Sequence, residues 1–321
     1  MLDLLEEIEI TNKEVEKDEL NFNFNGKLET KEEAKPNVSG IENVDLTKNV
    51  KVILFLINND SFKSKEKSYN LTVCGKPMKD WVKNAVKDFS TLEVEISNND
   101  DFLSKAKAHL DENYKYTLVL FSDTPLLKQK TVVDVLEYFV IKQLSCLKVS
   151  RGYVFETSYL KQVEKLYNPQ LQYFEEEDFI TCFNLKQYAL ISDIMKNRII
   201  SYHQKQGVRF TDVSSVIIDA DVSIESDVLI KSGNKIFGNT IIETGAIISE
   251  NNLIDNSVIM QNSKVENSTI KNSIVGKNCI VENYCTVKNK SVIGDNSILM
   301  GYNYVDNKKL ARDTKLSPYE K

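Results

Sequence analysis

A repeat of six residues in the last third of the chain constrains the fold more than any other feature. Aliphatic residues recur at every sixth position, with one slip in the middle of the segment, after which the spacing of six resumes. Neither an α-helix, with 3.6 residues per turn, nor a strand, with a period of two, produces it. A triangular coil with one aliphatic side chain pointing inward from each face does produce it. The repeat therefore predicts a left-handed parallel β-helix over residues 208–301. The inward positions are Ile218, Ile224, Ile230, Ile236, Ile242, Ile248, Ile254, then Ile259, Val265, Ile270 across the slip, and Val275, Val281, Val287, Ile293 and Leu299.

The corners of such a coil need residues that tolerate the left-handed backbone conformation, and asparagine is among the non-glycine residues best suited to it. In the slipped stretch, from Ile254 to Val275, the spacing predicts either tightened corners or a loosely specified coil. Asparagines recur at the expected corner positions, namely Asn256, Asn262, Asn267, Asn272, Asn278, Asn283 and Asn296.

Residues 51–183 alternate apolar strand segments with helical segments. Val52–Ile57 and Tyr116–Phe121 are continuous apolar runs, typical of strands buried on both faces. Helical spacing follows Pro77, and further helices are expected over 100–113 and 130–144. This order predicts an α/β, doubly wound, Rossmann-like domain with a largely parallel sheet. Asp123 follows the strand that ends at Phe121, at the edge of the sheet where ligands bind in such folds.

Residues 184–207 have the apolar spacing of a helix, and Gly207 is a natural stop. This helix is expected to join the two domains. Residues 302–321 are rich in lysine and other polar residues, and the sequence predicts a polar tail there.

Residues 1–50 carry 13 acidic and 6 basic side chains, whereas the whole chain has a net charge of −6. We predict that this segment is a disordered acidic tail, because it has too little apolar surface to offset the entropy it would lose on becoming ordered. Leu2, Leu5 and Ile8 could form one face of a short helix that docks on a protein partner, or belong to a frayed terminus.

The remaining 271 residues are nearly neutral, so we expect neither nucleic acid nor an anionic membrane as a partner. No apolar run is long enough to span a membrane, and the N-terminus lacks the features of a signal peptide. The five cysteines form no CxxC pair. They predict reduced thiols in a cytoplasmic protein without a metal site.

Three short motifs occur in a fixed order along the chain. They are the residues GKPM at 75–78, SDTPLL at 122–127 and NRIISYHQKQGV at 197–208, followed by DADV at 219–222. With this architecture, the chain resembles the bifunctional N-acetylglucosamine-1-phosphate uridyltransferase / glucosamine-1-phosphate acetyltransferase family over residues 51–270.

The resemblance implies transfer of a uridylyl group from UTP to a sugar 1-phosphate, with Mg²⁺ and release of pyrophosphate. It places Asp123 as a metal ligand, whereas the second ligand, an asparagine in the family, aligns with Phe183, and Asn184 one residue away is the candidate for it. Lys76 is the candidate for binding the nucleotide cofactor. It also implies a homotrimer formed through the β-helix.

The chain departs from the family pattern at several site elements. The glycines of the nucleotide loop become Ile57 and Asn59, and its arginine becomes Ser61. An isoleucine adds a β-branched side chain where phosphates would have to pass. The base-recognition element falls near residues 102–104, and the sugar-recognition element falls on Val149–Arg151. No residue is therefore assigned as catalytic.

The acetyltransferase half has no histidine to serve as general base, since His109 and His203 both lie outside the β-helix. His203 matches a histidine of the family's joining helix, where packing or capping is expected. We therefore expect a non-catalytic regulatory or scaffolding paralogue. The alternatives are a divergent, active sugar-1-phosphate nucleotidyltransferase that uses Asp123, Asn184 and the lysines at 63–67, and an acyltransferase with a different base.

Overall fold

The computed structural model describes residues 45–97, 100–167 and 169–320. The predictions for residues 1–44, including the docking helix, lie outside the described residues. Residues 46–50, which the sequence assigns to the tail, form helix α2 (Leu46–Asn49) and the first residue of strand β1 (Val50–Ile57). Asp45 caps α2 by accepting a hydrogen bond from the Thr47 amide, and Val50 is fully buried.

The first domain is built on a six-stranded sheet in the order β4-β1-β5-β7-β6-β8. β1 lies between β4 and β5 and is parallel to both, whereas β7 runs antiparallel to β5 and β6. The sheet is therefore largely parallel, with one reversed strand. Its other strands are β4 (Ser90–Ile96), β5 (Tyr116–Phe121), β6 (Cys146–Val149), β7 (Gly152–Glu156) and β8 (Gln170–Leu171).

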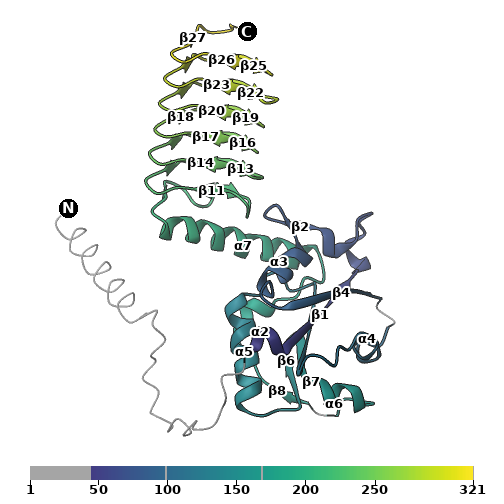
Figure 1. The fold of residues 1–321 in the computed structure, drawn as a ribbon. Helices are drawn as coiled ribbons and strands as arrows, with labels where there is room; N and C mark the ends of the chain where they lie inside the picture. Colours follow the sequence, from purple (N-terminus) through teal and green to yellow (C-terminus); the bar gives the residue numbers. More distant parts are fainter. Residues whose placement is uncertain (1–44, 98–99, 168, 321) are drawn as a thin grey trace, which may run out of the picture. The chain divides into compact units, whose positions relative to one another are not determined.

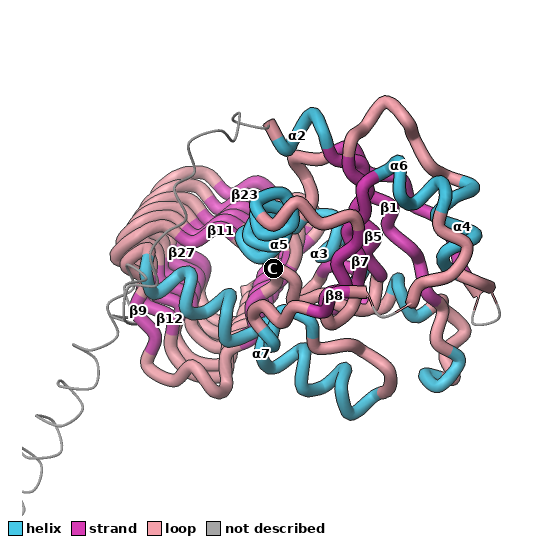
Figure 2. The backbone as a smooth tube through the Cα atoms, turned by 90° about the horizontal axis from the view of Figure 1, so that it is seen from below, coloured by secondary structure: helices cyan, strands magenta, loops and turns pink. Residues whose placement is uncertain are grey.

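Helices cover both faces of this sheet, with α3 and α5 on one side and α4 and α6 on the other (Figures 1 and 2). Alternate residues of β1 and β5 supply the two cores: Ile53 and Val119 pack with Leu103 of α4 and Leu160 of α6. The prediction of a doubly wound α/β domain is confirmed. The helices are α3 (Met78–Ala85), α4 (Phe102–Ala108), α5 (Gln129–Ile141) and α6 (Thr157–Gln162).

The links between these elements carry short structures that shape the edge of the sheet. They are the 3₁₀ turns η1 (Asp60–Phe62), η2 (Ser68–Asn70) and η3 (Glu176–Phe179), and the hairpin of β2 (Thr72–Val73) and β3 (Lys76–Pro77). The joining helix α7 (Leu185–Lys205) begins at Asn184, whose side chain accepts from two backbone amides, and ends before Gly207.

A left-handed parallel β-helix of about six coils follows α7. Its strands stack into three parallel sheets, each strand pairing with the strands one coil away (Figure 1). All fifteen inward positions named from the repeat are buried, fourteen of them completely. The strands are β9 (Arg209–Phe210), β10 (Ile217–Ile218), β11 (Ser223–Ile224), β12 (Leu229–Ile230), β13 (Lys235–Phe237), β14 (Ile241–Ile242), β15 (Ile247–Ile248), β16 (Leu253–Asp255), β17 (Val258–Ile259), β18 (Lys264–Val265), β19 (Thr269–Lys271), β20 (Ile274–Val275), β21 (Ile280–Val281), β22 (Thr286–Lys288), β23 (Val292–Ile293), β24 (Ile298–Leu299), β25 (Tyr304–Asp306), β26 (Lys309–Leu310) and β27 (Lys315–Leu316).

The slipped stretch of the repeat consists of tightened corners rather than a disordered coil. Ile254 pairs with Ile270, and Ile259 pairs with Val275, so the stacking of inward residues continues without a break. Six of the seven predicted corner asparagines have a positive φ. The exception is Asn283, where the next residue, Tyr284, takes the left-handed conformation with a φ of 62°.

The prediction that residues 302–321 form a polar tail is wrong. β25, β26 and β27 pair with the three strands of the coil below, so the β-helix extends past residue 301 to Leu316. Val305 is the completely buried inward residue of β25. Apolar residues continue at Val305, Leu310 and Leu316, in steps of six, five and six from Leu299, but the lysines beside Leu310 and Leu316 hide the pattern.

Within the described residues, no helix is both long enough and apolar enough to cross a membrane.

Candidate functional site

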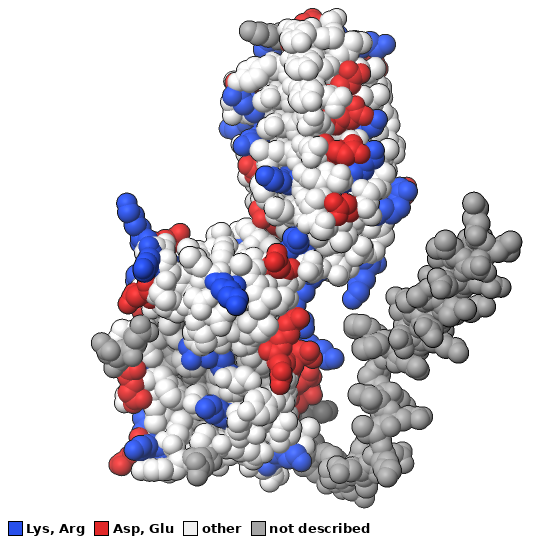
Figure 3. All heavy atoms as spheres, turned by 180° about the vertical axis from the view of Figure 1, so that it is seen from behind, with Lys and Arg blue, Asp and Glu red and all other residues white. Residues whose placement is uncertain are grey.

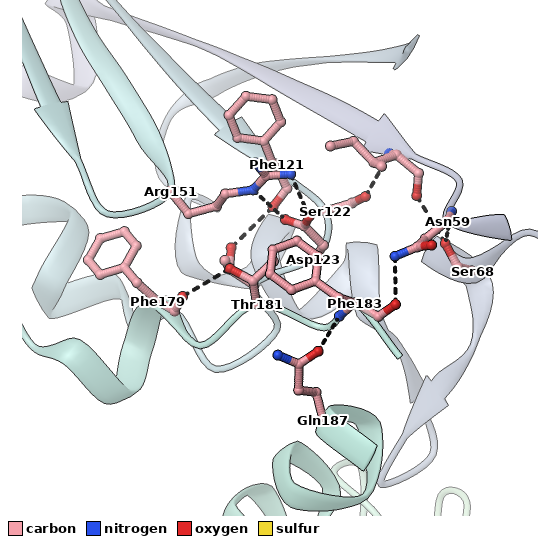
Figure 4. Close-up of polar contacts among 12 residues, drawn as sticks. Asn59, Ser68, Phe121, Ser122, Asp123, Arg151, Phe179, Thr181, Phe183 and Gln187 are labelled. Atoms are coloured by element: carbon pink, nitrogen blue, oxygen red, sulfur yellow. Dashed lines mark hydrogen bonds and ion pairs between the residues drawn. The ribbon is translucent and has the colours of Figure 1, made fainter. Parts of the chain in front are cut away.

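The predicted metal ligand Asp123 lies just beyond the end of β5 and is bound by an arginine. Arg151 Nε donates to one carboxylate oxygen at 3.2 Å, and Nη2 donates to the other at 2.7 Å (Figure 4). Arg151 reaches this point because β7 runs antiparallel to β5 and pairs Gly152 with Leu120, which brings the β6–β7 turn to the end of β5. The pair is bidentate, the strongest geometry for an arginine and a carboxylate.

Aromatic rings hold the guanidinium in place on this carboxylate. Its carbon lies 4.4 Å from the centre of the Phe121 ring and 6.0 Å from that of Phe183. Such contacts favour a planar cation and restrict its rotation. Asp123 is only 7% exposed. The positive charge beside the Asp123 carboxylate is therefore supplied by a side chain of the protein itself.

Asn184, the second predicted metal ligand, is committed to the start of α7. Its side-chain oxygen accepts from the Lys186 amide at 3.0 Å and from the Gln187 amide at 3.1 Å. The chain does bring this segment near Asp123, since the Cys182 amide donates to the Asp123 carbonyl at 2.8 Å. Burial, reinforced by the charge of Asp123, raises the pKa of the Cys182 thiol to about 12, so this cysteine stays a thiol.

These residues do not fit a magnesium site. Mg²⁺ requires oxygen ligands in an octahedral arrangement. Both oxygens of Asp123 accept from Arg151, and the Asn184 oxygen caps a helix. Over the ranges 45–97, 100–167 and 169–320, no group of three or more His, Cys, Asp or Glu is placed to hold a metal ion.

The loop after β1, where the family pattern places its phosphate-binding glycines, is closed by its own side chains. The Ile57 amide donates to Ser122 Oγ at 3.0 Å, and the Asn59 amide donates to Ser68 Oγ at 2.8 Å. The Ser61 amide donates to the Asn59 side chain at 3.0 Å. A phosphate-binding loop needs backbone amides that are free to point at the anion. Here three of these amides are already bonded.

The same loop is tied to the segment that precedes α7. Asn59 Nδ2 donates to the Phe183 carbonyl at 2.7 Å, and the Phe183 amide donates to Gln187 (Figure 4). Ser61 Oγ donates to the same carbonyl. The side chain of Ile57 packs with the aromatic cluster on the α4 side of the sheet. The position beside Asp123 is thus occupied by Arg151 and not by Ile57.

Lys76, predicted on the nucleotide side, faces the β-helix. Its ammonium lies 3.0 Å from the Asp221 carboxylate and 5.2 Å from the centre of the Trp81 ring. The neighbouring Cys74 carbonyl accepts from the Ala220 amide at 2.9 Å. Gly75, with a φ of +79°, lies so close to Asp219 that a Cβ there would be 2.5 Å from the carboxylate carbon. The GKPM segment therefore fastens the hairpin to the first coil.

The structure does not bring the lysines of the 63–67 segment to Asp123 as a phosphate-binding group. Lys67 pairs with Glu95 at 2.7 Å, and both side chains are about half exposed. His203 is 3% exposed, and its carbonyl accepts from the amides of Gln206 and Val208 at the end of α7. The side chain is thus packed, while the backbone of the same residue takes part in the C-terminal cap.

The sequence did not single out Arg151 or Phe183 as partners of Asp123. The only signal was the position of Arg151 in the element that aligns with sugar recognition. Arg151 and Asp123 are 28 residues apart in the sequence, and their contact depends on the reversed strand β7. No local pattern in the sequence reveals the direction of that strand.

Comparison with protein families matches residues 215–317 to the GMPPB C-terminal domain. This match covers the β-helix and supports its assignment, including the final coil beyond residue 301. It does not reach the α/β domain, so the uridyltransferase resemblance of that domain stays a prediction. Comparison with curated protein sequences gave no match.

Solved structures with a similar arrangement include enzymes of two kinds. A mutant of GDP-perosamine N-acetyl transferase from Caulobacter crescentus, with CoA and GDP-perosamine, is 11% identical, with 82% of this chain and 91% of that chain covered, at a TM-score of 0.32. A cytidylyltransferase from Leptospira borgpetersenii is 14% identical, with 48% and 87% covered, at 0.34. PerB from Caulobacter crescentus is 15% identical, with 40% of this chain and 60% of that chain covered, at 0.30. Likeness at these scores carries no argument about activity.

Proposed function

We propose that this protein is a non-catalytic paralogue of the sugar nucleotidyltransferases and acts as a regulatory or scaffolding subunit. The observation that carries the proposal is the bidentate pair between Arg151 and Asp123. A nucleotidyltransferase needs this carboxylate to hold a metal ion that neutralises the triphosphate. An arginine already neutralises it here, and a second positive charge would meet repulsion at the same place.

The closed loop after β1 supports the same conclusion independently. Binding of a triphosphate would require the amides of Ile57, Asn59 and Ser61 to leave side-chain acceptors that already satisfy them. It would also require the Asn59 and Ser61 side chains to release the Phe183 carbonyl. The two obstacles involve different residues, so removal of either one alone does not restore a site.

Calorimetry with Mg²⁺ and either UTP or UDP-N-acetylglucosamine tests this proposal. We expect no heat of binding for the unaltered protein. Low-micromolar binding that disappears in Asp123→Ala would overturn the proposal and favour an active nucleotidyltransferase. Arg209→Ala is the matched control, because Arg209 also pairs with an aspartate but lies on the β-helix.

The scaffolding role is proposed to rest on a homotrimer formed through the β-helix. The sheet that contains β14, β17, β20 and β23 presents a ladder of outward aliphatic residues, Ile241, Val258, Ile274 and Val292. Ile241 is 43% exposed. A ladder of outward aliphatic side chains is typical of surfaces that associate. Elsewhere on its surface the β-helix carries columns of charged side chains (Figure 3).

Sedimentation equilibrium tests the assembly. We expect a trimer for the unaltered protein and monomers for Ile274→Lys. Lys235→Ala, on another face of the β-helix, is the control. A monomer at micromolar concentration in the unaltered protein would overturn this part of the proposal.

We propose that the protein is cytoplasmic, because its cysteines are free thiols. They are Cys74, Cys146, Cys182, Cys279 and Cys285.

A further inference from the structure

A trough made of two adjoining hollows follows the C-terminal half of α7, and Asp123 lines neither of them. One end, of about 830 Å³, lies among α3, the segment that leads into α5, and α7. The other end, of about 940 Å³, lies between the end of α7 and the first two coils of the β-helix. Tyr202, His203, Ala220 and Val222 line both ends. The two hollows therefore share a wall and form one feature.

The two ends differ in chemistry. The first is lined mainly by apolar side chains, among them Trp81, Leu127 and Ile194. The second is lined by Asp221, Glu225 and hydroxyl side chains. One carboxylate oxygen of Asp221 pairs with the Lys76 ammonium. One carboxylate oxygen of Glu225 accepts from the Thr244 amide at 2.8 Å. Both residues line this hollow, so their carboxylates can accept hydrogen bonds from a ligand.

The wall between the two ends contains an unsatisfied buried group. Nδ1 of His203 has no hydrogen-bond partner within the described part of the chain, although the residue is only 3% exposed. A buried polar atom without a partner is costly and calls for an explanation such as a missing ligand. Beside it, the ring of Tyr202 is 60% exposed and stands edge-on to the imidazole, with ring centres 5.3 Å apart.

The wall at the apolar end is rigid. Asp178, which is fully buried, accepts from Arg198 at 2.8 Å and from Thr131 at 2.5 Å, and lies 2.7 Å from the Lys128 ammonium. Arg198 also bonds the Leu126 carbonyl. This network fixes α7 against the start of α5. The trough is therefore preformed, which lowers the entropy lost on binding.

We propose that the trough binds an extended segment of a partner protein. Its apolar side chain occupies the end near Trp81, its backbone passes over the wall that contains His203, and a lysine or arginine reaches Asp221 and Glu225. From Ile194 to Gln206 the helix spans about 18 Å, the length of roughly six extended residues. Lys128, Arg198 and Lys205 line the apolar end, so the complementarity is confined to the polar end, where the two carboxylates favour a basic side chain. Exposed tyrosine is a common anchor in protein interfaces. This binding does not depend on the state of Asp123.

Fluorescence polarisation with labelled hexapeptides tests the proposal. The set carries Leu, Phe or Trp as anchor and Arg at one to four positions after it. Matched peptides carry Ala in place of the anchor or Glu in place of Arg. We expect micromolar binding of an anchored basic peptide, and binding weaker by at least about tenfold for its Glu and Ala counterparts. No binding by any anchored basic peptide, or equal binding by the counterparts, would overturn the proposal.

Variants of the protein locate the site. Tyr202→Ala and Glu225→Gln should each weaken the best peptide by about tenfold, whereas Tyr173→Ala, which removes an equally exposed tyrosine elsewhere, should not. Nitrogen NMR of the imidazoles gives a second readout: the peptide should shift Nδ1 of His203 and leave His109 unchanged. Peptide binding that is unaffected by Tyr202→Ala and Glu225→Gln would place it elsewhere and overturn the assignment.

Discussion

Arg151, in the turn between β6 and β7, donates hydrogen bonds to both carboxylate oxygens of Asp123, from Nε at 3.2 Å and from Nη2 at 2.7 Å. The carboxylate thus keeps its place at the end of β5 while its charge is met by a side chain of the same chain. A residue in the expected position of a metal ligand has here become half of an ion pair that links β5 to β7.

Arg151→Ala should lower the free energy of unfolding by about 2 kcal/mol, because Asp123 would remain almost buried without a partner. The value lies at the low end for buried pairs, since the arginine side chain is 29% exposed. Urea unfolding measures it. Asp123→Asn in the Arg151→Ala background should recover part of the loss. Lys67→Ala, at an exposed pair screened by solvent, should change the stability far less than Arg151→Ala does, and an equal effect of the two single changes would contradict this account.

Gly75→Ala should destabilise the protein by about 3 kcal/mol. About 1 kcal/mol comes from the left-handed backbone and the rest from overlap with Asp219. Gly207→Ala is the matched control, because its φ is also positive but the nearest atom to an added Cβ is 3.4 Å away. It should cost about 1 kcal/mol. Asp219→Ala should recover part of the difference in the Gly75→Ala background. The account of Gly75 fails if the two glycine variants unfold at the same urea concentration.

Val305→Ala should lower the stability by about 2 kcal/mol, since its side chain points into the last coil and is fully buried. Tyr304→Ala, at the adjacent outward position, should have an effect below about 1 kcal/mol. Thermal unfolding compares the two. A neutral Val305→Ala would mean that residues 302–321 do not pack as a coil.

Burial holds the pKa of His203 below its ordinary value. The unfolded chain therefore binds more protons than the folded chain at mildly acidic pH, and stability rises with pH in that range. This contribution is fully present above about pH 6.5 and is lost as the pH falls toward the pKa of the folded state. His203→Gln should flatten the difference in unfolding free energy between pH 7 and pH 5. An unchanged pH profile in that variant would show that His203 does not contribute.

The β-helix could be predicted in detail because its determinants are local. Each inward residue, such as Ile236, needs only the residue six positions away to reveal its role, and corner asparagines such as Asn262 follow the same spacing. The last coil was missed because its lysines gave residues 302–321 the composition of a tail, although Val305 follows Leu299 by six residues and Leu316 follows Leu310 by six. Burial of Val305 shows that spacing was the better guide.

The strands and helices of the α/β domain were also visible in the sequence, because runs such as Tyr116–Phe121 are apolar throughout. Their pairing was not. The reversed direction of β7 decides that Arg151 meets Asp123, and the bonds from Asn59 and Ser61 to the Phe183 carbonyl span more than a hundred residues.

The sequence by itself thus determined the two architectures, the order of their elements and the absence of glycine from the loop after the first strand. Tertiary structure alone decided what took their place, because hydrogen bonds and ion pairs form between groups that are close in space and leave no period in the sequence. The carboxylate of Asp123 could be recognised from its position after a buried strand. Its partner Arg151, and the trough beside His203, exist only once the chain has folded.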